Sequence, residues 1–341
     1  MRRLLLLIVI AAFGAQPAQA ADQRPEIRAA IEGHILPGFT RLATSADALA
    51  EAAKAQCAPA SPPLRAAYQA AFDAWIEVSH LRFGPTEVDN RAFALAFWPD
   101  TRGATPKTLR RMIADEDSAV HDQATFKDVS IAARGFYGLE YLLYDQDLAG
   151  AGAPAYRCAL IIASARDIAA TSAAILDDWR GRYVGLMTDG VGGAASPYRT
   201  PDEAAQELFK SLMAGLEFTA DARLGRPLGS FDRPRPERAE ARRGGRSLRN
   251  VALSMTAMEA MATVLAADHP EVRDHVASAF EKALHLAARL DDPVFAGVNE
   301  PQGRLKVEIL QQSIRAARDK VANELGPALG VAEGFNAMDG D

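Results

Sequence analysis

The chain has 341 residues, of which 44 are acidic and 38 are basic, so its formal net charge at pH 7 is −6. This acidic balance argues against a general nucleic-acid or anionic-membrane partner. The length is ample for a large hydrophobic core, formed by one big domain or by two domains of ordinary size.

The N-terminus has the pattern of a targeting segment. Arg2 and Arg3 precede the apolar run LLLLIVIAAF, and Ala18-Gln19-Ala20 has the small-x-small pattern of a cleavage site. We therefore predict a signal peptide over residues 1–20. No Cys follows the cleavage site, which argues against a lipid anchor, and we expect no later stretch to span a membrane, which needs about 20 apolar residues. A host with two membranes would hold the mature protein in its periplasm.

Helical spacing of apolar residues dominates the rest of the chain, and no alternating strand pattern is visible. We predict an all-α fold of helical bundles. A shorter helix is expected to start at Pro106, with Thr105 as its N-cap. The long helices are predicted over residues 25–54, 64–83, 125–145, 155–181, 202–223, 246–267, 270–290 and 302–325.

Three irregular stretches interrupt these helices. The first, from Phe83 to Pro106, carries aromatic and paired charged residues, so we expect it to be ordered. The second, GLMTDGVGGAASPYRTP, ends at Pro201 and predicts a boundary between an N-terminal bundle over 21–190 and a C-terminal bundle over 191–341. The third, from Leu224 to Gly245, is rich in Arg and is either a solvated arm or part of a site. The matching tetrads GLEY and GLEF, at 138–141 and 215–218, suggest that the two bundles are internal repeats.

Cys57 and Cys158 are the two cysteines of the chain. In an oxidising compartment they favour one disulfide, and two buried free thiols are the alternative. Neither lies in a CxxC motif, which argues against metal binding or thioredoxin-like chemistry.

The stretch RGFYGLEYLLYD combines two glycines, one carboxylate and three tyrosines. On a helix over 125–145, Tyr137, Glu140 and Tyr144 lie on one side, next to an apolar stripe. Gly135 and Gly138 share another edge, where a neighbouring helix can approach closely. Glu140 is therefore expected at a core boundary, flanked by phenols that can donate hydrogen bonds.

Arg82 continues the apolar stripe of the preceding helix, and an inward-facing arginine requires a carboxylate or a bound anion. We predict that it lies beside Glu140, either in a polar pocket that binds a ligand or in a closed salt bridge that only locks the helices together. The motif FWPDTRG and the start of the helix at 246 add further charged groups. The predicted ligand-binding residues are Arg82, Asp100, Arg102, Tyr137, Glu140 and Arg246.

Support for enzyme chemistry is weak. Glu77 and His80 form an E-x-x-H pair, but both point away from the face of Trp75, so we expect them to be solvated. The chain has no HExxH, no GxSxG and no phosphate-binding glycine loop. We predict no catalytic residue, no metal ligand and no cofactor.

With these residues placed, the sequence resembles the imelysin family of exported bacterial proteins. The resemblance covers most of the mature chain and rests on WIEVSHLRFGP, FWPDTRG, the GFYGLE region and RSLRNVALSM. It implies two helical-bundle halves related by an internal repeat, with a site near the surface where they meet. The named member of the family was described as an insulin-cleaving metallopeptidase, and related members are periplasmic proteins associated with iron uptake.

The family motif GxHxxE aligns with residues 135–140, where Gly135 and Glu140 match but Tyr137 stands in place of the His. A phenol is usually a hydrogen-bond donor at neutral pH, whereas imidazole is a good metal ligand. We therefore predict a non-catalytic, imelysin-like binding protein that takes a small ligand or a periplasmic or outer-membrane protein partner, with iron uptake as one process it could serve. The alternatives are a metal-dependent peptidase, a weak ferric site formed by Tyr137 with Glu140 and Tyr144, and a structural or protein-interaction module without a ligand.

Overall fold

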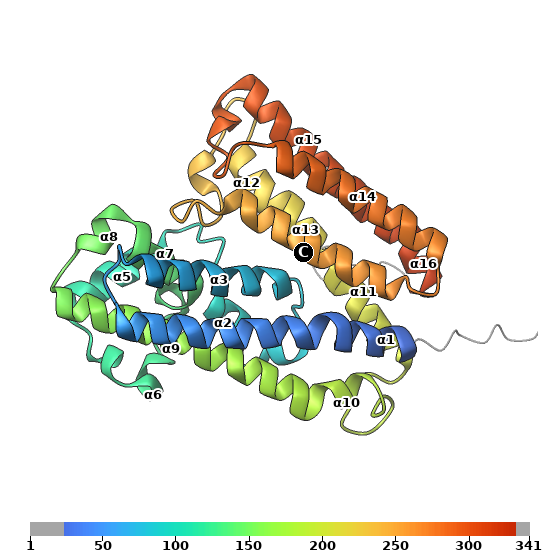
Figure 1. The fold of residues 1–341 in the computed structure, drawn as a ribbon, viewed down its shortest axis with the longest axis horizontal. Helices are drawn as coiled ribbons and strands as arrows, with labels where there is room; N and C mark the ends of the chain where they lie inside the picture. Colours follow the sequence, from blue (N-terminus) through green and yellow to red (C-terminus); the bar gives the residue numbers. More distant parts are fainter. Residues whose placement is uncertain (1–23, 332–341) are drawn as a thin grey trace, which may run out of the picture.

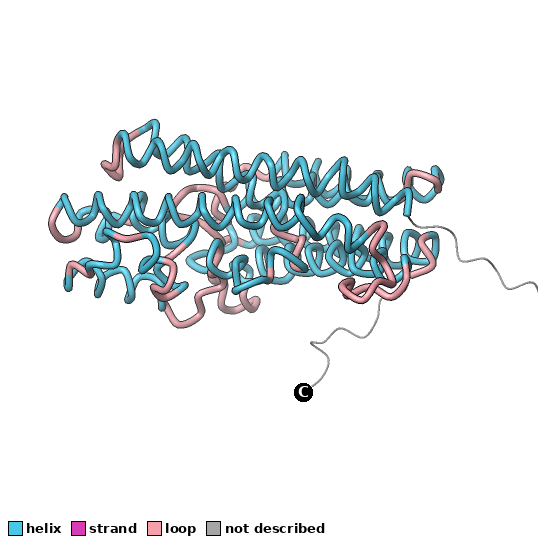
Figure 2. Tube along the Cα trace, turned by 90° about the horizontal axis from the view of Figure 1, so that it is seen from below, coloured by secondary structure: helices cyan, strands magenta, loops and turns pink. Residues whose placement is uncertain are grey.

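The computed structural model describes residues 24–331, and this part of the chain is helical throughout, with loops between the helices and no strand (Figure 2). The predicted signal peptide over 1–20 lies outside the described residues. The longer helices are α2 (Leu36–Ala55), α3 (Pro62–Val78), α5 (Ala104–Asp115), α7 (Gly135–Tyr144), α9 (Pro154–Asp178), α11 (Pro201–Glu217), α13 (Ser247–Leu265), α14 (Pro270–Arg289) and α15 (Pro301–Lys320). The short helices are α1 (Arg24–Ala30), α4 (Arg91–Leu95), α6 (Gln123–Phe126), α8 (Gln146–Gly150), α10 (Val184–Met187), α12 (Gly225–Leu228) and α16 (Gly326–Ala328).

The helices form two neighbouring groups, and the all-α prediction is confirmed. In the first, which we call the N-terminal group, α2 packs against α3 and α9. In the second, which we call the C-terminal group, α13 packs against α14, and α14 packs against α15. Contacts between α3 and α13 join the two groups along the middle of the molecule (Figure 1). The boundary at residue 190 and the internal repeat stay predictions.

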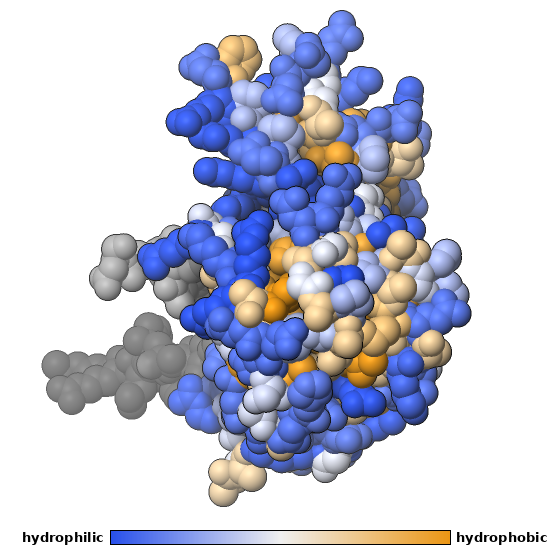
Figure 3. Space-filling model, turned by 90° about the vertical axis from the view of Figure 1, so that its left-hand side faces the viewer, coloured by the Kyte–Doolittle hydropathy of each residue, from blue (hydrophilic) through white to orange (hydrophobic). Residues whose placement is uncertain are grey.

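Figure 3 shows the end of the molecule that lies on the left of Figure 1. Apolar groups gather over the lower part of this face, which the N-terminal group of helices forms. Hydrophilic groups cover most of its upper part, which belongs to the C-terminal group. The two groups of helices therefore present different surfaces to solvent at this end.

Helix α3 is shorter than predicted, because it ends at Val78 and a turn follows. The apolar stripe therefore does not extend to Arg82 as a helical wheel would place it. This early end is the reason why the predicted position of Arg82 is wrong.

The single helix predicted over 125–145 is also wrong, because α6 already ends at Phe126 and α7 starts only at Gly135, after a short 3-10 turn. The backbone of Gly135 has φ +69°, and a Cβ there would lie 2.2 Å from the carbonyl oxygen of Leu95. Only glycine tolerates both the left-handed conformation and this contact. Helix α7 starts at Gly135, so the close approach predicted for this glycine is confirmed, but the neighbour is the end of α4 and not the side of a long helix.

The run Pro154–Met187, which includes α9 and α10, is long and apolar enough to cross a membrane, contrary to our expectation from the sequence. Of its most apolar window, 61% is buried inside the molecule. Burial of this extent is typical of the core helix of a bundle, which satisfies the same test of length and composition.

A disulfide joins Cys57, just after α2, to Cys158 in α9, with 5.1 Å between the two Cα atoms. The predicted disulfide is confirmed. It closes a loop of 101 residues that includes α3 to α8.

Candidate functional site

Arg82 does not meet Glu140. Its Nε donates to Oε1 of Glu87 at 2.6 Å, and both side chains are more than a third exposed. The predicted pairing of Arg82 with Glu140 is therefore wrong, and the two residues do not share a polar pocket. The cation of Arg82 instead lies over the ring of Phe93, 4.9 Å from its centroid.

The two charged residues of FWPDTRG, Asp100 and Arg102, do not come together in one site. The carboxylate of Asp100 accepts the backbone N–H groups of Ala104 and Thr105, each at 2.8 Å, so it caps α5. Helix α5 is the short helix predicted near Pro106, but Thr105 is not its N-cap. Arg102 is exposed, and its carbonyl accepts the ammonium group of Lys107.

Glu140 is buried at the point where the C-terminal group of helices meets α7. It is 2% exposed, and its Oε1 accepts the backbone N–H of Gly244 at 2.8 Å. Burial raises the pKa of Glu140, although the N–H of Gly244 and the cation of Arg243 act in the opposite direction. The Arg-rich loop thus closes over this carboxylate and leaves it out of solvent.

Tyr137 points to a second carboxylate on the same loop. Its hydroxyl donates to Oε1 of Glu240 at 2.5 Å, and Glu240 is only 1% exposed. The other oxygen of Glu240 accepts Nε of Arg223 at 2.8 Å and Nδ2 of Asn250 at 2.9 Å. Burial, followed by the charge of Glu240, raises the pKa of Tyr137 well above its usual value, so the phenol keeps its proton.

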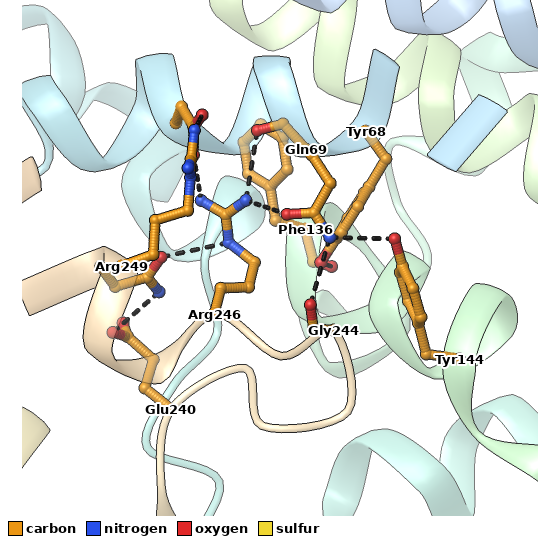
Figure 4. A network of polar contacts seen from close by, with 10 residues as sticks. Tyr68, Gln69, Phe136, Tyr144, Glu240, Gly244, Arg246 and Arg249 are labelled. Carbon is orange, nitrogen blue, oxygen red and sulfur yellow. Dashed lines mark hydrogen bonds and ion pairs between the residues drawn. The ribbon is translucent and has the colours of Figure 1, made fainter. Parts of the chain in front are cut away.

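Arg246 extends this arrangement to α3 (Figure 4). Its guanidinium donates to Oδ1 of Asp73 at 2.7 Å and to Oδ1 of Asn250 at 3.1 Å, and it also bonds Gln69. It lies 4.4 Å from the ring centroid of Phe72. Arg246 is therefore fully buried with its donors engaged inside the protein.

We call these residues the junction network. The N-terminal group of helices provides some members and the C-terminal group provides the others, so each hydrogen bond across it ties the groups together. The junction network consists of Gln69, Asp73, Tyr137, Glu140, Arg223, Glu240, Arg246 and Asn250.

The sequence analysis missed Arg223 and Glu240, the most buried ion pair of this network. Their side chains are 4% and 1% exposed. The signal for Arg223 is its place at the end of the long helix predicted over 202–223, where it falls among apolar residues. Glu240 carries a weaker signal, because it stands alone between two alanines in an otherwise basic loop.

The junction network does not fit a catalytic metal. Among residues 24–331 no group of three or more His, Cys, Asp or Glu side chains is placed to hold a metal ion. The hydroxyl of Tyr137 donates a hydrogen bond to Glu240, and the charge of Glu240 is neutralised by Arg223. A metal ion would have to displace both partners before it could bind Tyr137 or Glu240.

Trp98 forms an outer layer over the junction network. Its ring stacks on Tyr137, with 6.3 Å between the centroids, and meets Phe218 edge-on at 5.8 Å. The guanidinium of Arg226 lies 5.7 Å from the centroid of the Trp98 ring. FWPDTRG therefore touches both groups of helices, through Trp98 and not through the charged residues that the sequence analysis selected.

A pair of histidines is buried nearby. His80, predicted to be solvated, is only 6% exposed, and its Nε2 lies 3.3 Å from Nε2 of His34. His34 comes from the π-helical turn Ile31–Ile35 that links α1 to α2. Gly215 of α11 gives His80 room, because a Cβ at this glycine would lie 2.6 Å from the Cβ of His80.

The histidine pair makes stability depend on pH. Burial, with a smaller effect from Arg41, lowers the pKa of His34 to about 4, and the pKa of His80 is lowered well below 6.5 by burial, His34 and Arg223. The unfolded chain takes up these protons near pH 6.5, so stability is complete above that pH and is lost as the pH falls toward 4. For His34 alone, we expect the free energy of unfolding to fall by about 2 kcal/mol between pH 7 and pH 5.

Urea unfolding at several pH values measures this loss. His34→Gln should reduce the slope of unfolding free energy against pH. The same change at the exposed His285 should preserve that slope. An identical slope in the wild type and in His34→Gln would refute the assignment.

Three comparisons place this geometry among known proteins. The family model for imelysin matches residues 35–321. An imelysin-like protein from Psychrobacter arcticum 273-4 superposes with a TM-score of 0.77 at 19% identity, over 94% of this chain and 99% of the other. A protein assigned as an iron-regulated protein A precursor from Parabacteroides distasonis gives a TM-score of 0.71 at 15% identity, over 92% of this chain and 97% of that one. No curated protein matches the chain.

Proposed function

Since the chain belongs to the imelysin family, we propose that it is an exported, non-catalytic binding protein whose family motif holds the two groups of helices together. The observation that carries this proposal is the hydrogen bond from Tyr137 to Glu240, at the position where the motif has His. A buried phenol that keeps its proton donates a hydrogen bond, and here that bond joins the two groups of helices. The phenol offers neither a metal ligand nor a base to activate water.

The binding surface of this proposal lies beside Trp98, one layer outside the junction network. Glu140 and Arg246 are buried and engaged, and Arg82 and Arg102 lie apart from them. The half-buried Trp98 contacts residues of both groups. A ligand or a periplasmic partner held there would contact both groups at once.

Export and a link to iron uptake are part of the proposal. The signal-peptide pattern over residues 1–20 supports export. The assignment of one structural neighbour as iron-regulated supports the link to iron.

Metal titration tests the non-catalytic role. We expect protein purified from its native compartment to contain no stoichiometric metal. Ferric, zinc and copper ions should bind wild type and Tyr137→Phe equally weakly. Neither of these two proteins should cleave peptides. Tyr183→Phe is the matched control, because Tyr183 also bonds another side chain, the hydroxyl of Tyr198 at 2.7 Å.

One equivalent of metal that is lost in Tyr137→Phe but kept in Tyr183→Phe would contradict the proposal. Metal-dependent peptide cleavage would contradict it as well, and would revive the peptidase alternative.

The junction network also favours a second candidate, a module that only interacts with other proteins, because the network is closed around Glu140. Saturable binding of a small molecule beside Trp98 distinguishes the binding protein from this module.

A further inference from the structure

Within residues 24–331, Arg226 is a cation without a neutralising neighbour. Its Nε is buried and has no hydrogen-bond partner among these residues, and its guanidinium lies over the face of Trp98. Burial lowers the pKa of Arg226, and the cation of Arg238 lowers it further. A lowered arginine pKa is the opposite of what a carboxylate partner would cause.

The surrounding loop concentrates positive charge. Between Leu224 and Arg246 the sequence holds seven arginines and three acidic residues, in a chain whose formal net charge is −6. Within the protein, two of these three acids are already engaged, since Glu240 binds Arg223 and Glu237 lies 3.6 Å from Arg235. The third acid, Asp232, forms no ion pair with Arg226 or Arg238 in the described part of the chain, so the charges of these two arginines are left to attract an anion from solvent.

The geometry also suits recognition of an oxyanion. The cation–π contact holds the guanidinium of Arg226 over the indole ring of Trp98. Because Nε of Arg226 is buried, its two terminal NH2 groups are the donors available for two parallel hydrogen bonds to the oxygens of a carboxylate or a phosphate. Arg238 is exposed, so the second guanidinium is reachable from solvent.

From these observations we propose that Arg226 and Arg238, beside Trp98, form a binding site for a small oxyanion, a carboxylate or a phosphate. The inference rests on the proposed non-catalytic function and names the class of ligand. The anion would neutralise two adjacent cations and bridge α12 to the turn at Arg238, beside Trp98.

Calorimetric titration at low ionic strength with citrate and, separately, with inorganic phosphate tests this site. We expect saturable binding that Arg226→Gln and Arg238→Gln each weaken at least tenfold. Arg226→Lys keeps the charge but loses the two-pronged donor, so it should bind several-fold more weakly than wild type. Arg199→Gln is the control, because Arg199 is an exposed arginine of another loop that pairs with Glu203.

The two anions distinguish the sources of the ligand. Stronger binding of citrate assigns a carboxylate, and stronger binding of phosphate assigns a phosphate; each supports the site. No saturable binding of either anion, or binding that both Gln variants retain, would overturn it. Arg238 is exposed, so Arg238→Gln should fold even if a variant at Arg226 does not.

The failure of this site is distinguishable from failure of the proposed function. Bound metal or peptide cleavage would refute the non-catalytic role and leave the oxyanion titration unaffected. An absent oxyanion site would leave the result of the metal titration unchanged.

Discussion

Replacing Glu240 with Ala should lower the free energy of unfolding by about 3–5 kcal/mol, because Arg223 would be left as an uncompensated buried charge. Arg223 is 4% exposed, and its remaining partners are hydroxyl groups of Ser79 and Thr219. Tyr137 and Asn250 would lose their acceptor in the same variant. Guanidinium unfolding followed by circular dichroism measures the change.

Glu237→Ala is the matched control for this prediction. Glu237 lies on the same loop and near an arginine, but its side chain is 52% exposed, so its ion pair should contribute less than about 1 kcal/mol. A Glu240→Ala variant that is no less stable than Glu237→Ala would show that Glu240 is not buried against Arg223.

Loss of the disulfide should have an effect of similar size. Joining residues 101 apart removes loop-closure entropy from the unfolded chain, which corresponds to about 4–5 kcal/mol in the chain-entropy model. The double variant Cys57→Ser, Cys158→Ser should therefore unfold at a much lower denaturant concentration than the wild type.

A reductant provides the control for the disulfide. It should lower the stability of wild type toward that of the double Ser variant and leave the variant itself unchanged. A loss below about 1 kcal/mol would mean that the unfolded chain is already compact around this loop.

Much of the fold follows from the sequence. Helical periodicity located the long helices to within a few residues for most of the chain, because a repeated apolar face is a signal that extends over many positions. The compartment suggested by the first 20 residues favoured the disulfide, which the structure confirms. The errors fall at helix termini, at the end of α3 at Val78 and at the start of α7 at Gly135. One residue or one tertiary contact decides these positions.

The candidate site was harder to predict, for a physical reason. Tyr137 and Glu140 were expected at a core boundary and are buried, but their partners lie more than 100 positions away, in a loop without periodicity. The prediction instead paired Glu140 with Arg82, a cation on the apolar stripe of the helix predicted over 64–83. A local pattern cannot show how an irregular loop folds back over a distant helix, and Glu240 therefore escaped notice.

The third irregular stretch shows how composition can mislead. Its six arginines suggested a solvated arm as one reading. In the structure Arg243 pairs with Asp145 at 2.8 Å and lies over the ring of Tyr141, and Arg246, just after the stretch, is buried against Phe72. Arginine can serve as a core residue when aromatic faces and carboxylates surround it.

The central claim is that Tyr137 locks the two groups of helices together through Glu240, and a double-mutant cycle tests it most directly. The stabilities of wild type, Tyr137→Phe, Glu240→Gln and the double variant would be measured by guanidinium unfolding. The hydrogen bond between two buried groups predicts a coupling free energy of about 1–3 kcal/mol. Effects that add to within about 0.5 kcal/mol would contradict the lock, because independent residues behave in that way.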